Sequence, residues 1–202
     1  MHPESIDKKT KLVLEKIKSS VNAFYLAGGT ALAIQLGHRK SIDLDFFSKD
    51  SFDLSPLEKT LVSLGKFEIT GKDEGTLHGI LDGVKISFMR YDYRSLFPFS
   101  DFDGVNLADK RDISAMKIDT ISSRGSKKDF VDLYFLLYEF SIKELIGFYE
   151  KKYSEIDYNK IHIVKSLTYF EDADGEPLPE MIKDFDWEKA KEKITNAVKT
   201  II

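Results

Sequence analysis

Residues 23–48 constrain the fold more than any other part of the chain, because three structural patterns follow one another there. The apolar run AFYLAGG, residues 23–29, ends in a glycine pair and predicts a short buried strand that stops at a tight turn. The run TALAIQLG, residues 30–37, predicts a helix that Gly37 can end in a left-handed cap. The run SIDLDFFS, residues 41–48, alternates in polarity and predicts a second strand. Together the three runs predict a strand–helix–strand unit.

The rest of the chain divides into a mixed first half and a helical second half. A lysine-rich helix is expected over residues 5–19, and another helix over residues 54–65. Strand-like runs separated by Gly and Asp turns follow, at residues 66–72, 75–83 and 84–93. Helical patterns then continue to the end, over residues 109–125, 127–140, 141–153, 157–170 and 186–202. This order predicts an α+β fold, with a core over residues 1–105 and a helical region over residues 106–202 packed on it.

The composition is that of a globular protein and excludes several classes of function. Of the 202 residues, 42% are hydrophobic and 32% are charged, which is not the composition of a disordered chain. The net charge of −4 gives no overall attraction for nucleic acid, and the lack of cysteine excludes disulfides and thiolate metal sites. No signal-peptide pattern is present, and no apolar run reaches the ~20 residues that span a bilayer. We therefore expect a cytoplasmic protein without membrane segments.

Two aspartates one residue apart are the first candidate for chemistry. If residues 41–48 form a strand, Asp43 and Asp45 share one face of it, roughly 7 Å apart along the chain. Two carboxylates this close repel each other unless a cation lies between them. A divalent ion such as Mg²⁺ or Mn²⁺ suits such a pair and keeps coordination positions open for phosphate oxygens. The alternative is a pair of solvated carboxylates on an edge strand.

The glycine pair ahead of the helix is the second candidate. Gly28 and Gly29 let the backbone turn tightly and approach a ligand closely. Thr30 is expected to begin the helix, where free N–H groups and the positive end of the helix dipole favour an anion. The turn GHRKS places Arg39 just before the aspartates, where a basic side chain can screen the carboxylates or contact phosphate oxygens. The alternative is an ordinary strand-to-helix turn capped by Thr30.

A third group of polar residues lies in the helical half, within residues 112–137. Lys117 follows an apolar residue on one expected helix, and Arg124 lies in the turn after it. Asp129 and Asp132 are three positions apart and therefore share a face of the next helix. Taken alone, these residues also suit a helix start stabilised by Asp129 and solvated basic side chains.

The run GGTALAIQLGHRKSIDLDFF resembles the first motif of nucleotidyltransferases of the DNA polymerase β superfamily. Its GHRKSIDLDFF segment is similar to the AbiEii/AbiGii toxin branch, known from abortive-infection and toxin–antitoxin systems. A helical motif, MK…RG…KDF.DLY.LL, and the late stretch SLTYFEDADGEPLPEM resemble the same branch, so the likeness spans roughly residues 20–190. The resemblance implies a polymerase β-like core with a mixed sheet and flanking helices, followed by helices.

The resemblance also implies an activity and roles for particular residues. A nucleoside triphosphate would be the substrate, with its phosphates at the corner formed by residues 28–30 and Mg²⁺ at the two aspartates. Lys117, with Arg39 or Arg124, would bind the triphosphate, and Asp129 or Asp132 would complete the site. The acceptor would be a hydroxyl of tRNA or another RNA, of a protein, or of a small molecule. An antitoxin protein is the implied partner.

One departure from the superfamily pattern keeps a second function open. Many relatives carry a third aspartate on a later strand, but the central inward position of residues 84–93 is Ser87. Asp82 and Asp92 lie in the preceding turn and near the strand end. The third carboxylate comes from Asp129 or Asp132, or the protein works with two. The rival function is a catalytically degenerate module that binds nucleotide or antitoxin. A phosphohydrolase lacks support because no His–Asp metal doublet is present.

Overall fold

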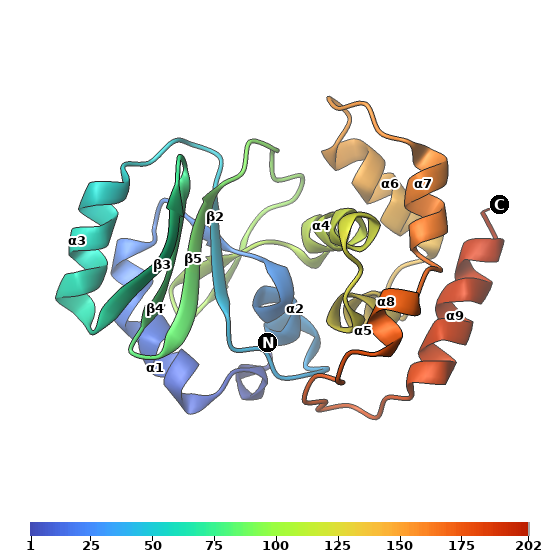
Figure 1. Cartoon of the computed structure of the whole chain (residues 1–202), viewed down its shortest axis with the longest axis horizontal. Helices are drawn as coiled ribbons and strands as arrows, with labels where there is room; N and C mark the ends of the chain where they lie inside the picture. The colour runs from blue at the N-terminus through green and yellow to red at the C-terminus, as the bar shows by residue number, and fades with distance from the viewer. Residues whose placement is uncertain (202) are drawn as a thin grey trace. The chain divides into compact units, whose positions relative to one another are not determined.

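The structure, a computed structural model, describes residues 1–201, which divide into two compact units. One unit holds residues 1–94 and 98–109, and the other holds residues 95–97 and those from 110 onward. Figure 1 shows that the strands of the described chain lie in the first unit, whereas helices α4 to α9 belong to the second.

The first unit combines short helices with a mixed β-sheet. Its helical elements are η1 (Pro3–Ser5), α1 (Lys8–Ile17), η2 (Lys18–Ser20), α2 (Gly28–Leu36) and α3 (Leu54–Leu64). Its strands are β1 (Tyr25–Leu26), β2 (Leu44–Ser48), β3 (Phe67–Asp73), β4 (Thr76–Leu81), β5 (Val84–Arg90), β6 (Ser100–Phe102) and β7 (Val105–Leu107). Among the described residues these strands form one seven-stranded sheet in the order β3-β4-β5-β2-β1-β7-β6. The pairs β2–β5 and β1–β7 are parallel, and the others are antiparallel.

Side-chain alternation gives this sheet one apolar face. Phe46 of β2, Phe88 of β5 and Leu77 of β4 are fully buried, and the first two rings stack with centroids 5.3 Å apart. Figure 1 shows α1 and α3 along one face of the sheet, and both helices bury leucines of their own, such as Leu14 and Leu61. Burial of these side chains is the main stabilising contribution of the unit. The opposite face carries Asp45, Ser87 and His78 of the central strands together with the apolar Phe47 and Met89.

The second unit is built around one buried helix. Its helices are α4 (Lys110–Ser123), α5 (Lys127–Leu136), α6 (Ile142–Lys152), α7 (Lys160–Ser166), α8 (Glu171–Asp174) and α9 (Trp187–Lys199). Helix α4 packs against α5, α6 and α7. Asp112 in α4 accepts hydrogen bonds from the backbone N–H groups of Leu96 and Phe97 at 3.0 Å and from Lys152 of α6 at 2.8 Å. A single buried carboxylate therefore joins a loop and two helices.

The predicted α+β fold class is confirmed, with differences at the ends of elements. Helix α2 begins at Gly28 rather than Thr30, and β2 begins at Leu44, so Asp43 precedes the strand. The hairpin of β6 and β7 was not predicted. The helix expected over residues 157–170 is shorter, and the last helix covers Trp187–Lys199; residue 202 lies outside the described residues.

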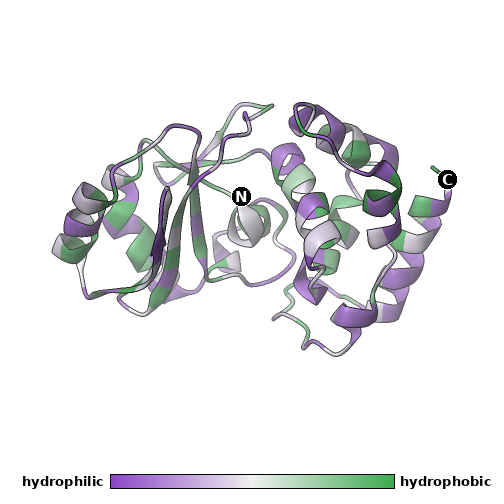
Figure 2. Cartoon of the chain, turned by 45° about the horizontal axis from the view of Figure 1, so that its top comes forward, coloured by the Kyte–Doolittle hydropathy of each residue, from purple (hydrophilic) through white to green (hydrophobic). Residues whose placement is uncertain are grey.

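Hydropathy is mixed along the elements of both units. Figure 2 shows hydrophilic and hydrophobic residues alternating on the helices and strands, as expected when one side of each element is buried. Over the part of the chain that the structure describes, no helix is long and apolar enough to cross a membrane.

Candidate active site

The glycine corner and the second aspartate of the pair lie next to each other. Gly28 begins α2 with φ +66°, a conformation that favours glycine, and no side chain caps this end of the helix. A Cβ atom added to Gly28 would lie 3.3 Å from Oδ2 of Asp45. The helix N-terminus, where backbone N–H groups favour an anion, is therefore in contact with a carboxylate that suits a cation.

Arg39 covers the second glycine of the corner. A Cβ on Gly29 would lie 2.5 Å from Nη2 of Arg39, so a larger residue at position 29 would displace the guanidinium from this place. The Arg39 side chain is 3% exposed, and its Nη1 donates to the carbonyl of Lys40 at 3.0 Å. A buried, oriented guanidinium at a helix N-terminus adds positive charge and planar donors where phosphate oxygens would lie.

Thr30 ties the helix to the segment that carries the aspartates. Its hydroxyl is buried and makes hydrogen bonds with the backbone carbonyl of Asp43 and with Oγ of Ser41, the latter at 2.8 Å. Ser41 was not singled out from the sequence, and only its contact with Thr30 identifies it. Thr30 thus fixes the spacing between the corner and the carboxylate pair.

The two aspartates are half-buried, and the backbone of Asp45 makes hydrogen bonds within the sheet. Asp45 lies in β2, where its carbonyl accepts a hydrogen bond from Ala27 N–H at 3.0 Å and its Cα pairs with Ser87 of β5. Among residues 1–201 no group of three or more His, Asp and Glu side chains has the arrangement of a metal site. Two carboxylates still fit Mg²⁺, which commonly takes one or two from the protein and completes its shell with water and phosphate oxygens.

The position of a third strand carboxylate is occupied by a serine. Ser87 is the direct cross-strand neighbour of Asp45. The sequence placed Ser87 at the central inward position of residues 84–93 but did not predict this pairing. Asp82, in the β4–β5 turn, instead binds Lys16 and the N–H of Lys66. Asp92 binds Arg90 at the surface. In the first unit, neither of these aspartates takes the place beside Asp45.

Lys117, Asp129 and Asp132 form a compact ion cluster inside the second unit. Nζ of Lys117 lies 2.8 Å from Oδ1 of Asp129 and 2.6 Å from Oδ2 of Asp132. The three side chains are 8%, 1% and 0% exposed. Ser126 donates a hydrogen bond to the other oxygen of Asp129 at 2.6 Å. The sequence predicted that the two aspartates share a face, and the structure brings both to the same ammonium.

The charge of Lys117 determines the ionisation of Asp129. Burial alone would raise the pKa of this carboxyl, and so would the nearby charge of Asp132. The positive charge of Lys117 and hydrogen bonds from Lys117 and Ser126 outweigh both effects and hold the pKa of Asp129 below its usual value. Asp129 is therefore ionised near neutral pH.

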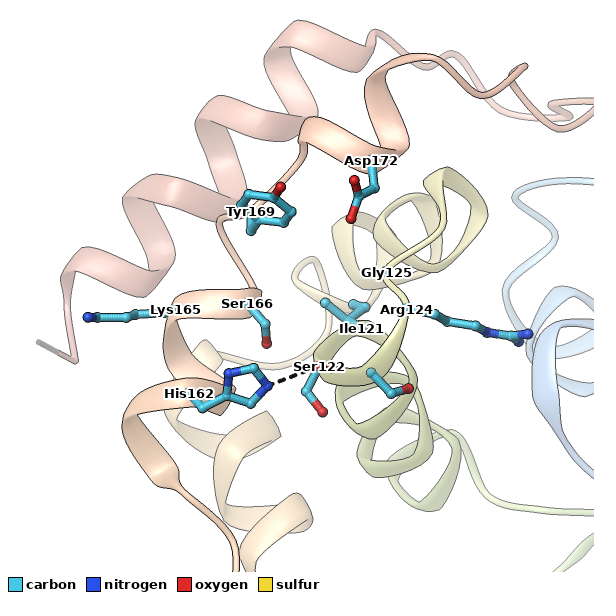
Figure 3. Close-up of a pocket in the computed structure, with 10 residues that line it drawn as sticks. Ile121, Ser122, Arg124, Gly125, His162, Lys165, Ser166, Tyr169 and Asp172 are labelled. Atoms are coloured by element: carbon cyan, nitrogen blue, oxygen red, sulfur yellow. Dashed lines mark hydrogen bonds between the residues drawn. The ribbon is translucent and has the colours of Figure 1, made fainter.

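Arg124 lies at the exposed end of α4, between two cavities of the second unit. One cavity of about 350 Å³ is also lined by His162 and Tyr169, and one of about 500 Å³ by Ser126 and Lys128. Figure 3 shows the Arg124 side chain pointing away from the first cavity, whereas the ring of His162 points toward Ser122 and lies 3.1 Å from its carbonyl. The guanidinium is accessible to an anion.

Known proteins resemble the chain over nearly its whole length. The model of the family "Nucleotidyl transferase AbiEii toxin, Type IV TA system" matches residues 14–100. An uncharacterized protein of Aquifex aeolicus (strain VF5) is 42% identical over 205 residues, which cover 95% of this chain and 98% of the relative.

Solved structures with low sequence identity have the same fold. A candidate nucleotidyltransferase from H. pylori has a TM-score of 0.64 at 17% identity, covering 100% of this chain and 96% of that one. JHP933 from Helicobacter pylori has a TM-score of 0.60 at 16% identity, covering 98% and 93%. MenT4, described as nucleotidyltransferase toxin Rv2826c from Mycobacterium tuberculosis H37Rv, has a TM-score of 0.60 at 14% identity, covering 94% and 82%.

The matched segment and the site coincide. Residues 14–100 include the glycine corner, Arg39 and both aspartates, which the first unit brings together. The likeness to solved structures agrees with the α+β fold of the described residues. Over residues 14–100 the chain carries a nucleotidyltransferase domain of the AbiEii toxin family.

Proposed function

We propose that the protein transfers a nucleoside monophosphate from a nucleoside triphosphate to a hydroxyl acceptor, with Mg²⁺ or Mn²⁺ at Asp43 and Asp45. The observation that carries this proposal is the 3.3 Å separation between the Cβ position of Gly28 and the Asp45 carboxylate. That contact brings an anion-binding helix end and a cation-binding pair together, and phosphoryl transfer needs both. The triphosphate and the divalent ion can then share phosphate oxygens.

In the first unit, some residues bind the phosphates and another positions the aspartates. The N–H groups of α2 and the guanidinium of Arg39 hold phosphate oxygens, and Thr30 keeps the corner in register with the aspartates. The ion, when bound at the aspartates, supplies charge stabilisation for the attacking and leaving oxygens of an in-line displacement. The acceptor oxygen forms a bond to the α-phosphorus. The bond between the α-phosphorus and the oxygen that bridges it to the β-phosphorus breaks, and pyrophosphate leaves.

Two cations of the second unit are further candidates for binding the triphosphate, as the family resemblance implies. Lys117 and Arg124 offset charge on the β- and γ-phosphates. Asp129 and Asp132 act by positioning Lys117, whose ammonium they hold at 2.8 and 2.6 Å. Arg124 is exposed at the end of α4 and is therefore the more accessible of the two cations.

The acceptor class and the biological role are proposed from the family. We infer a hydroxyl of tRNA or another RNA as the acceptor, with a protein or small-molecule hydroxyl as the alternative. We also infer that the protein is the toxin of a type IV toxin–antitoxin or abortive-infection system, with an antitoxin as its partner. Membership of a family of type IV toxins supports this role, and so does the likeness in fold to MenT4, itself described as a nucleotidyltransferase toxin. A toxin that consumes nucleoside triphosphates would act in the cytoplasm.

Transfer of label from an α-labelled nucleoside triphosphate tests the proposal. Purified protein, Mg²⁺ and total bacterial RNA or protein should give labelled acceptor, and Asp43→Asn with Asp45→Asn should abolish it without unfolding the chain. Asp50→Asn is the matched control, because Asp50 is exposed just after β2. If no acceptor is labelled and nucleotide with Mg²⁺ causes no thermal shift, the proposal is wrong.

A degenerate binding module is the second candidate, favoured by one observation. Ser87 occupies the position beside Asp45 where many superfamily enzymes have a carboxylate. Binding distinguishes the two functions: an active site should bind nucleotide in a Mg²⁺-dependent way and label an acceptor. A degenerate module that serves only to be bound by antitoxin should do neither.

A further inference from the structure

Three polar residues lie side by side on one face of the sheet in the first unit. In the registers of β2, β5 and β4, Asp45 pairs with Ser87, and Ser87 pairs with His78. Residues directly opposite each other on neighbouring strands point to the same face. The three side chains therefore form a row that crosses the sheet from the proposed metal site outward.

Ser87 and His78 contact each other through their side chains. Nδ1 of His78 lies 2.9 Å from Oγ of Ser87. Both residues are half-buried, whereas their sequence neighbours Leu77 and Phe88 are fully buried on the opposite, apolar face. When the ring carries its proton on Nε2, Nδ1 accepts a hydrogen bond from the serine hydroxyl. The pair is thus oriented for movement of a proton from Ser87 to His78.

A cavity of about 320 Å³ opens over the Ser87–His78 part of this row. His78 and Ser87 line it together with Thr70, Ile80 and Lys85. The β3–β4 register changes from Ile69 opposite Gly79 to Gly71 opposite His78, so Thr70 is left unpaired in a bulge. Bulges re-aim side chains and are frequent beside active sites. The first unit therefore leaves room for a second molecule next to Ser87, which is itself the cross-strand neighbour of Asp45.

We propose that Ser87 contacts the acceptor hydroxyl in this cavity and that the Ser87–His78 pair takes its proton, in place of a third strand carboxylate. This inference rests on the proposed nucleotidyl transfer. The acceptor O–H proton moves to Oγ of Ser87 while the serine proton moves to Nδ1 of His78. At the same time the acceptor oxygen bonds to the α-phosphorus, and pyrophosphate leaves. Ser87 is then a catalytic residue, and His78 is a positioning residue that acts through it.

The chemistry requires both members of the pair. A serine hydroxyl is too weak a base to hold the proton at neutral pH, whereas imidazole is the commonest general base of enzymes. His78 lies on the strand beyond Ser87, two strands from Asp45 in the order β4-β5-β2. The serine bridges that separation. Loss of either residue should therefore interrupt the same proton path, and a carboxylate at position 87 should replace both.

Single-turnover labelling of total bacterial RNA and protein from an α-labelled nucleoside triphosphate tests the inference. We expect His78→Ala and Ser87→Ala each to slow transfer about 100-fold, with little further loss in the double variant. Adding Ser87→Asp to His78→Ala should recover at least about tenfold, because a carboxylate beside Asp45 accepts the proton directly. His2→Ala is the control, since the His2 side chain is 40% exposed and binds Glu4.

Nucleotide binding separates this inference from the proposed function. The variants should keep the thermal shift caused by nucleotide with Mg²⁺, because neither residue holds phosphate or metal. An inert wild-type chain would refute the proposed transfer itself. An active wild-type chain whose His78→Ala variant retains at least a third of the rate would refute the proton path alone. Failure of Ser87→Asp to recover any rate in a folded, nucleotide-binding variant would also overturn it.

Discussion

Replacing Lys117 by methionine tests the ion cluster of the second unit. The substitution keeps the length of the side chain but removes the cation that contacts both Asp129 and Asp132, which are 1% and 0% exposed. Two buried carboxylates then face each other without that positive charge. Such an arrangement is costly because a buried charge has lost its hydration, and the hydrogen bonds that remain do not replace the lost cation.

The magnitude follows from the distances. At 2.8 and 2.6 Å and an effective dielectric constant of about 20, each attraction to Lys117 amounts to about 6 kcal/mol before desolvation. Much of this offsets the cost of burying the charges, and removal of one partner from a buried pair typically costs about 3–5 kcal/mol. Domains are stable by only about 5–15 kcal/mol. Lys117→Met should therefore remove about a fifth or more of the free energy of unfolding.

Urea unfolding followed by circular dichroism at several pH values measures this effect. In the wild-type chain the lowered pKa of Asp129 stabilises the fold above the unfolded-state pKa of about 4, and this stabilisation is lost as the pH falls through the folded pKa. In Lys117→Met, burial and the charge of Asp132 raise the pKa of Asp129 instead. The penalty of the substitution is then largest at neutral pH and shrinks between pH 7 and about 4 as Asp129 becomes protonated.

A neighbouring lysine supplies the control. Lys128 is exposed in the first turn of α5, so Lys128→Met should change the free energy of unfolding by less than about 0.5 kcal/mol. If Lys117→Met costs less than about 1 kcal/mol at pH 7, or if its cost grows toward pH 4, the electrostatic account of the cluster is refuted.

Further substitutions test the hydrogen bonds and the backbone of the two units. Gly37→Ala should cost about 1 kcal/mol in urea unfolding, because Gly37 ends α2 at φ +63°. Lys152→Met should lower the free energy of unfolding by about 3 kcal/mol, because it leaves the buried carboxylate of Asp112 without its cation. Equal urea midpoints for the variant and the wild type would exclude a stabilising role of this ion pair. Thr30→Val should lower the free energy of unfolding by about 1–2 kcal/mol, because the Thr30 hydroxyl bonds the backbone carbonyl of Asp43 directly. It should also weaken Mg²⁺-dependent nucleotide binding more than Ser41→Ala does, and isothermal titration measures the difference.

The corner was predictable because its residues are close in the sequence. One helix and one return turn separate Gly28 from Asp45, so the strand–helix–strand pattern alone brings them to the same end of the sheet. Ser87 was also identified, because alternation fixes which residues of a strand point inward. The start of α2 was misplaced by two residues, since the positive φ of Gly28 lies inside the first turn rather than before it.

Two features were missed although the sequence carries signals for them. Asp103 and Gly104 both have positive φ, which is the two-residue hairpin turn that an Asp-Gly pair favours, and it joins β6 to β7. The Asp-Gly pair at residues 82 and 83 makes the same turn between β4 and β5. The Asp-Gly turn fixes the register of β4 and β5, and in this register His78 and Ser87 are cross-strand partners. Their contact therefore follows from the position of the turn.

The burial of the Lys117 cluster could not be derived from spacing. Helical periodicity places Asp129 and Asp132 on one face, but Lys117 belongs to a different helix, and its approach depends on how α4 and α5 pack. The sequence alone is equally compatible with solvated side chains. Packing also gives Asp112 its contacts with two backbone N–H groups and Lys152. Both clusters show charged residues fixed by tertiary contacts that no local pattern specifies.

The first unit contains three elements that serve transfer to a hydroxyl. An uncapped helix end with Arg39 suits the phosphates, Asp43 and Asp45 suit the metal, and the Ser87–His78 pair suits the acceptor proton. Strand register and short turns hold these elements, so their spacing is set before any substrate binds. A module that only binds nucleotide needs the first two elements and gains nothing from an oriented serine and histidine facing a cavity. The pair beside Asp45 therefore favours an enzyme over a degenerate binding module.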